Sequence, residues 1–214
     1  MLLTAEIRWF WREIPPAFEA WFRDASPAHC AAGGGAVRVD EYLAEAGKIE
    51  LGVKRRGGTE GLEIKGMVTG DFATLSCAPF TGPIGLWCKW SSELLEMPSG
   101  RTITVEKRRW LRRFASAEGA TREIPLDESE QPAESARFSL PGCNVELTRI
   151  GLPDNSCWWT LGFEALGTLP SLAWEITQAA KIMVERRPPP IEPGWIGGYP
   201  AWMNRHVLAS ASRG

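Results

Sequence analysis

Residues 52–66 read GVKRRGGTEGLEIKG, two short alternating segments separated by glycines. Lys54 and Arg56 fall on one parity of the first segment, and Glu63 and Lys65 fall on one parity of the second. A period of two is typical of β-strands, and two strands joined across a glycine-rich turn form a hairpin. The stretch therefore predicts a hairpin that carries charged side chains on one face.

The same alternation recurs along most of the chain. Strands are expected over residues 4–12, 37–44, 49–56, 62–68, 85–90, 102–115, 136–140, 145–150 and 158–166. Short strands with few helices between them favour an antiparallel sheet that closes on itself, which also removes exposed strand edges. The predicted fold class is α+β, mainly β: an antiparallel closed or nearly closed barrel of about eight strands, with helices packed outside.

Two helices are expected beside the strands. The first has Pro15 and Pro16 in its first turn and carries apolar residues at helical spacing, and the second covers residues 171–187. Three prolines at 188–190 end the second helix. We therefore expect one barrel domain over residues 1–187 and a Pro- and Gly-rich tail over residues 188–214 that packs on it. The acidic connection 116–134 is expected to be mostly surface loop.

Composition excludes several classes of protein. The chain has 214 residues, of which 44% are hydrophobic and 23% charged, as in ordinary globular domains. A net charge of −2 disfavours a globally basic nucleic-acid binder, and two histidines are too few for a His-rich metal site. Five cysteines without a C-x-x-C pair predict free thiols and a cytoplasmic protein. The apolar runs are too short to span a membrane.

The charged residues within the strands gather on one parity. That parity holds eight cations and four carboxylates: Arg8, Arg12, Lys54, Arg56, Lys65, Lys89, Lys107, Arg109, Glu6, Glu63, Glu146 and Glu164. Its excess of four positive charges is offset by an excess of six negative charges elsewhere in the chain. A total near zero is therefore compatible with a local cationic face.

Two interpretations of this face remain open from alternation alone. It is either the solvated outer surface of the sheet, as in most antiparallel sheets, or the lining of a barrel wide enough for water. Cations that face one another inside a barrel need interleaved acids or an anionic ligand. Arginine binds phosphate through two parallel hydrogen bonds, and carboxylates hold Mg²⁺, so the second interpretation indicates a phosphorylated ligand.

The order of these motifs resembles the CYTH superfamily, the triphosphate tunnel enzymes that include thiamine triphosphatase, inorganic triphosphatases and class IV adenylyl cyclases. The resemblance covers residues 3–185. It rests on AEIRWF at the start, a helix, a strand with Asp40, Glu41 and Tyr42, then GVKRRG, LEIKG, EKRRW, VELTRI and GFEALG in order. It implies an eight-stranded tunnel that grips a triphosphate with inward Lys and Arg, and glutamates that hold Mg²⁺ or Mn²⁺.

The resemblance also implies roles for particular residues. The implied phosphate ligands are Lys54, Arg56, Lys65, Lys89, Lys107 and Arg109. The implied metal-side acids are Glu6, Glu146 and Glu164, and Glu63 is a supporting acid that holds cationic side chains in place.

The sequence departs from the family at the metal side. The family opens with Glu-x-Glu-x-Lys, whereas Arg8 and Phe10 stand at the second and third of these positions, and Gly162 stands where the closing Glu-x-Glu has its first acid. An arginine in place of a carboxylate reverses the local charge, so Arg8 joins the expected phosphate ligands. Three functions follow: binding of a triphosphate-like or organophosphate anion with hydrolysis undecided, Mg²⁺-dependent triphosphate hydrolysis at an atypical site, or a non-catalytic structural or protein-interaction barrel.

The eleven tryptophans mostly occupy strand positions, where aromatic residues pack well. Trp87 and Trp90 flank Lys89 and are the best candidates for stacking on a ligand. The basic run 107–113 is divided between two faces by the strand period, which disfavours a nucleic-acid surface. The expected partner is a small phosphorylated anion, with no membrane and no nucleic acid.

Overall fold

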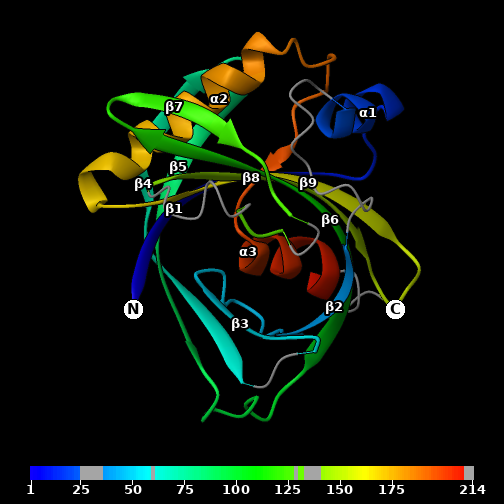
Figure 1. The fold of residues 1–214 in the computed structure, drawn as a ribbon. Coiled ribbons are helices and arrows are strands. Elements are labelled where there is room, and N and C mark those ends of the chain that lie inside the picture. The colour runs from blue at the N-terminus through cyan, green and yellow to red at the C-terminus, as the bar shows by residue number, and fades with distance from the viewer. Residues whose placement is uncertain (25–35, 59–60, 128–129, 133–140, 210–214) are drawn as a thin grey trace.

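A computed structural model describes residues 1–24, 36–58, 61–127, 130–132 and 141–209 (Figure 1). Its strands are β1 (Leu2–Trp11), β2 (Ala36–Leu43), β3 (Leu51–Arg56), β4 (Leu62–Cys77), β5 (Phe80–Ser92), β6 (Thr102–Ala117), β7 (Ala120–Ile124), β8 (Gly142–Gly151), β9 (Cys157–Leu166) and β10 (Trp195–Ile196). Its helices are α1 (Pro16–Asp24), α2 (Leu172–Glu185) and α3 (Tyr199–Met203), with a 3₁₀ turn at Leu169–Ser171 and a π-helical turn at Asn204–Leu208.

Eight strands close into an antiparallel barrel. Their order is β1-β5-β4-β3-β2-β6-β8-β9, and β9 pairs with β1 to complete the circle. The predicted mainly β, α+β barrel is confirmed. Two further strands lie beside it: β7 pairs with β6, and the short β10 pairs with the end of β1 that β5 does not reach.

Some predicted boundaries are wrong. The connection 116–134, expected to be mostly loop, contains β7, which forms a hairpin with β6. The hairpin of β4 and β5 is longer than residues 62–68 and 85–90, because register shifts between Met67 and Ala73 interrupt the period of two without ending the pairing. The strand expected at 136–140 lies outside the described residues.

The main apolar core lies outside the barrel wall. Ile7 and Trp9 of β1 point outward and pack in one cluster with Phe18 and Phe22 of α1 and with apolar residues of α2. Helix α2 runs across the outer faces of β1, β4, β8 and β9 (Figure 1). The two helices therefore cover the apolar side of the sheet, and the charged parity faces the interior.

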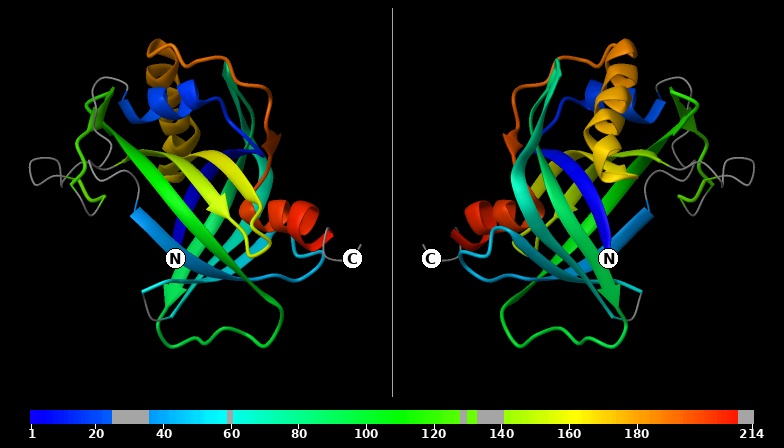
Figure 2. Two further views of the ribbon diagram at one scale, coloured as in Figure 1. Left: turned by 90° about the vertical axis from the view of Figure 1, so that its right-hand side faces the viewer. Right: turned by 90° about the vertical axis from the view of Figure 1, so that its left-hand side faces the viewer.

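A second apolar cluster fills one end of the barrel interior. It includes Phe10, Tyr42 and Ile150 from the strands and Trp202 from α3. Figure 2 shows α3, in red, at one end of the barrel. The tail after residue 188, expected to pack on the barrel, thus crosses its end and reaches into the interior. None of the described helices is long and apolar enough to cross a membrane.

Candidate functional site

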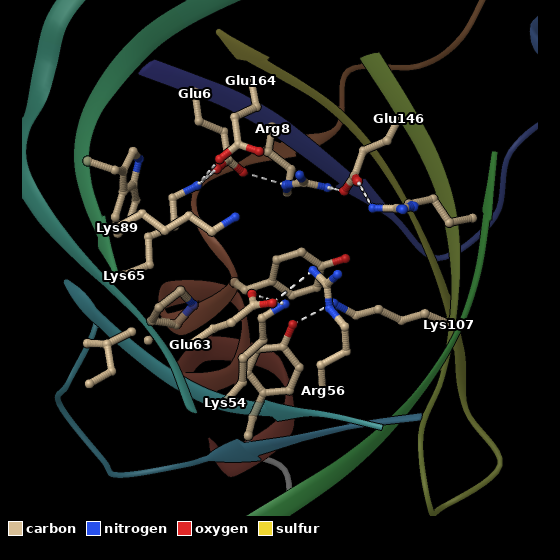
Figure 3. A pocket seen from close by; sticks show the side chains of 18 of the residues that line it. Glu6, Arg8, Lys54, Arg56, Glu63, Lys65, Lys89, Lys107, Glu146 and Glu164 are labelled. Carbon is tan, nitrogen blue, oxygen red and sulfur yellow. Dashed lines mark hydrogen bonds and ion pairs between the residues drawn. The ribbon is translucent and has the colours of Figure 1, made fainter. Parts of the chain in front are cut away.

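A cavity of about 120 Å³ occupies the other part of the barrel interior (Figure 3). All eight barrel strands and the beginning of α3 contribute to it. Eight cations and four carboxylates line the cavity: Arg8, Arg38, Lys54, Arg56, Lys65, Lys89, Lys107, Arg109, Glu6, Glu63, Glu146 and Glu164. The structure therefore brings all eleven expected site residues to one cavity.

Cross-strand pairing explains how distant residues meet here. Directly opposed residues in an antiparallel pair place their side chains on the same face. Glu6 of β1 is opposite Glu164 of β9, and Lys65 of β4 is opposite Lys89 of β5. Two carboxylates and two ammonium groups are thus forced into neighbouring positions, which is unfavourable unless each finds an opposite charge.

Arg8 is the centre of one wall of the cavity. Its guanidinium contacts Glu6 on one side at 2.6 Å, Nε to Oε1, and Glu146 on the other at 2.7 Å, Nη1 to Oε1. Its side chain is only 5% exposed. Burial would by itself lower the pKa of Arg8, but Glu146 and Glu6 outweigh this effect and raise the pKa well above its ordinary value. The arginine is therefore a permanent buried charge.

Gly162 makes room for Arg8. The two residues are directly opposed in the pairing of β1 with β9, and a Cβ atom at position 162 would lie 2.5 Å from Cζ of Arg8. A larger side chain at this position would displace the guanidinium. Arg8 and Gly162 are thus in contact, and the missing side chain at position 162 leaves the space that the guanidinium occupies.

Lys65 holds the two opposed carboxylates of this wall. Its ammonium contacts Glu6, and it donates a hydrogen bond to Glu164 at 3.0 Å. Burial would raise the pKa of Glu6, but the charges of Lys65 and Arg8 prevail and lower it to about 2. Glu6 is therefore ionised at any physiological pH.

Asp40 lies beneath the facing wall and is fully buried. Its carboxylate lies 3.2 Å from Arg38, 3.6 Å from Lys54 and 3.4 Å from Lys107. Burial is the main cause, and repulsion from Lys54 the second, that lowers the pKa of Lys107 well below its usual range. This wall is thus short of negative charge, and an anion in the cavity would stabilise the protonated Lys107.

The remaining cations are unevenly compensated. Glu63 lies 3.0 Å from both Lys54 and Arg56, and Arg109 contacts Glu130 as well as Glu146 at 3.5 Å. Within the described part of the chain, Lys89 forms no ion pair. The lining has an excess of four positive charges. Asp40 and Glu130 do not line the cavity themselves, but each contacts a lining cation, and counting them reduces this excess to two.

The carboxylates fit a directly bound metal ion poorly. Glu6 and Glu164 both pair with Lys65. Glu146 pairs with Arg8 and Arg109, and it lies on the other side of the Arg8 guanidinium from Glu6. Among the described residues, no group of three or more His, Cys, Asp or Glu side chains is placed to hold a metal. Their arrangement instead orients the cations around the cavity.

Three aromatic residues also line the cavity: Tyr42, Trp87 and Tyr199. Lys107 donates a hydrogen bond to the Tyr42 hydroxyl at 2.5 Å, and Lys65 lies 5.4 Å from the centre of the Trp87 ring. Trp90 has the opposite parity, does not line the cavity and is 39% exposed, so its predicted stacking role is not supported by its position.

Sequence reasoning missed several residues of the site. Arg38, Asp40 and Tyr42 alternate on one strand, and the parity argument applied to residues 37–44 would have found them. Alternation predicts Arg12 on the inner parity, but this residue lies over the Trp158 ring at 4.0 Å and does not line the cavity, because β1 ends at Trp11. No sequence pattern indicates Tyr199 as a site residue, since it lies in the proline-rich tail, which has no periodicity.

The fold and the site together define a class: a closed antiparallel β-barrel with a cationic cavity inside and its helices on the outside and at one end. Comparison of the chain with protein-family models and with curated proteins finds no match.

Proposed function

We propose that the cavity binds a small anion with several phosphate groups, triphosphate-like or an organic phosphate. The observation that carries this proposal is the enclosure of eight cations around one cavity with only four carboxylates among the lining side chains. Burying charge is costly unless the charge is paired and hydrogen-bonded. An anion would supply the missing partners, and the fork-shaped guanidinium groups of Arg8, Arg56 and Arg109 match phosphate oxygens.

The resemblance to the CYTH superfamily is part of the same proposal. The inward direction of the Lys and Arg side chains supports it, because the family's chemistry requires a cationic barrel interior. The contact of Arg8 with Gly162 supports a modified site, in which a fixed guanidinium supplies positive charge on the metal side. In this proposal Mg²⁺ or Mn²⁺ is bound by the ligand's phosphates and enters with them. The protein's own carboxylates are already paired with Lys65 and Arg8.

The first test compares two adjacent arginines of β3. Arg56 lines the cavity, whereas Arg55 points outward, is 52% exposed and pairs with Glu41. Isothermal titration and thermal shift with tripolyphosphate, ATP and thiamine triphosphate at low salt, with and without Mg²⁺, should show binding by the wild type. Arg56→Ala should weaken it about 10-fold or more, because a charge-assisted hydrogen bond to phosphate is lost, and Arg55→Ala should not.

The outcomes separate the three candidate functions. Phosphate release from a bound triphosphate that requires Mg²⁺ would establish the hydrolase with an atypical site. Binding without turnover would establish an anion-binding barrel. If no phosphoanion stabilises the wild type at low salt, the proposal fails and the structural or protein-interaction barrel is what remains.

A further inference from the structure

The barrel interior changes from polar to apolar along β1 and β6. On β1 the inward residues are Glu6 and Arg8, followed by Phe10, and on β6 they are Arg109 and Lys107, preceded by Val105. The charged members line the cavity, and the apolar members belong to the cluster around Trp202. The interior is therefore not a uniform tunnel, because buried apolar side chains fill one end of it.

Helix α3 holds this end closed. Trp202 is fully buried and stacks on Phe10 with ring centres 5.2 Å apart. Asn204 accepts a hydrogen bond from the Gly47 backbone at 2.6 Å and donates to the carbonyl oxygens of Glu45 and Lys48 at 3.2 and 3.3 Å. These contacts fasten the C-terminal segment to the loop after β2, as a fixed part of the barrel.

Tyr199 forms the boundary between the closed end and the cavity. Its ring lies between two cations, with Arg8 Cζ 5.0 Å and Lys107 Nζ 3.8 Å from its centre, and it stacks on Tyr42. Its hydroxyl is buried and has no hydrogen-bond partner among the described residues. A buried hydroxyl without a partner is costly, and beside a cavity it is a donor available to a bound anion.

We propose that the C-terminal segment turns the barrel into a blind pocket that accepts only the end of a phosphate chain, with Tyr199 as a ligand-binding residue at its floor. The inference rests on the proposed function and narrows it to short phosphoanions that insert a terminal phosphate. An open cationic tunnel could slide along a long linear polyphosphate. A pocket closed at this end by Trp202, Phe10 and Tyr199 cannot, because a polyphosphate chain cannot leave the barrel through the buried side chains.

The number of protein molecules on one polyphosphate chain distinguishes these geometries. We would titrate the protein with polyphosphate of about 60 phosphates at low salt and measure the stoichiometry by sedimentation velocity, counting only protein that excess tripolyphosphate displaces. The blind pocket predicts at most two proteins per chain, one at each end. Three or more displaceable proteins per chain would overturn the closure.

Tyr199→Phe tests the hydroxyl. The matched control is Thr148→Val, which removes another buried hydroxyl without a hydrogen-bond partner, at a position that does not line the cavity. We expect Tyr199→Phe to weaken tripolyphosphate binding about 3- to 10-fold, the effect of one hydrogen bond, with no fall in the ligand-free melting temperature. Thr148→Val should leave the affinity unchanged.

The results separate this inference from the function on which it rests. If the wild type binds no phosphoanion, the proposed function fails. If it binds tripolyphosphate but Tyr199→Phe binds equally well, the role of Tyr199 is wrong and anion binding stands. Equal losses in Tyr199→Phe and Thr148→Val would also overturn that role, because they would indicate a general disturbance of the barrel interior.

Discussion

Arg8 is a buried arginine with a carboxylate on each side. In the ligand-free protein Glu6 and Glu146 neutralise it, and Gly162 opposite leaves space for its guanidinium. The carboxylates of this wall therefore act first as partners of cations. Removing the charge of one carboxylate tests whether it also binds a metal ion.

Glu6→Gln provides that test at the scale of one residue. The amide keeps the shape of the side chain but removes a negative charge next to Arg8 and Lys65. If the carboxylate only holds these cations, the affinity for tripolyphosphate measured in EDTA should rise a few-fold, because the cavity becomes more positive. The free energy of unfolding should fall by about 1–3 kcal/mol, since Lys65 and Arg8 each lose a partner.

Glu41→Gln is the control for this variant, because Glu41 pairs with Arg55 on the outer face of the barrel and should change neither quantity by more than about 0.5 kcal/mol. The opposite result would be a loss of affinity in Glu6→Gln seen only with Mg²⁺ present. That result would place a metal ion at Glu6 and reject the interpretation of this carboxylate as a partner of cations.

At the scale of elements, α3 is the helix that the sequence does not predict, because it lies in a proline-rich tail. Residues 188–203 show no period that predicts a strand or a helix, yet β10 pairs with β1 and α3 packs inside the barrel. The aromatic residues of the tail indicated packing on the barrel. Their location at its end followed only from the barrel's closure, which leaves Phe10 and Trp158 exposed unless something covers them.

Trp202→Ala should therefore destabilise the whole protein. Trp202 is fully buried against Phe10 and Trp158, and deleting a large core side chain costs about 3–5 kcal/mol through lost burial and the cavity that remains. Urea unfolding followed by circular dichroism would measure this loss. Trp174→Ala on α2 is the matched control, since that tryptophan is 39% exposed, and its cost should be much smaller. A loss in Trp202→Ala as small as the one expected for Trp174→Ala would mean that α3 is not part of the cooperative unit.

At the scale of the whole molecule, the barrel separates charge by position. The cavity is lined with an excess of cations, while the chain as a whole carries a charge of −2. The structure keeps this arrangement stable with ionised carboxylates: Arg8 and Arg109 lower the pKa of Glu146 well below its usual range against the effect of burial, as Lys65 and Arg8 do for Glu6.

Acid should thus destabilise the barrel by protonating the carboxylates of its interior. A carboxylate with a lowered pKa contributes stability that is complete above its pKa in the unfolded chain, about 4.3, and is lost as the pH falls toward its pKa in the folded protein, about 2 for Glu6. We expect the urea midpoint to be steady from pH 7 to 5 and to fall steadily below. The contribution of Glu6 alone is of order 3 kcal/mol. A midpoint unchanged between pH 5 and pH 3 would contradict the ion-pair network described above.

The sequence alone determined which residues share a face. The period of two assigned eleven of the lining residues to one parity, and the turn at 57–61 assigned the hairpin, because both depend only on local backbone geometry. It also set the mainly β class and the two outer helices.

The tertiary structure decided which face is inside and where the interior ends. Alternation is symmetric between the two faces of a sheet, so only closure of β9 on β1 and coverage of the apolar side by α1 and α2 turn the charged side inward. Likewise, Tyr199 and Trp202 are distant in sequence from every strand of the cavity. The place of Tyr199 at the cavity floor and that of Trp202 in the apolar cluster depend on packing between segments far apart in the chain, and no local pattern encodes that.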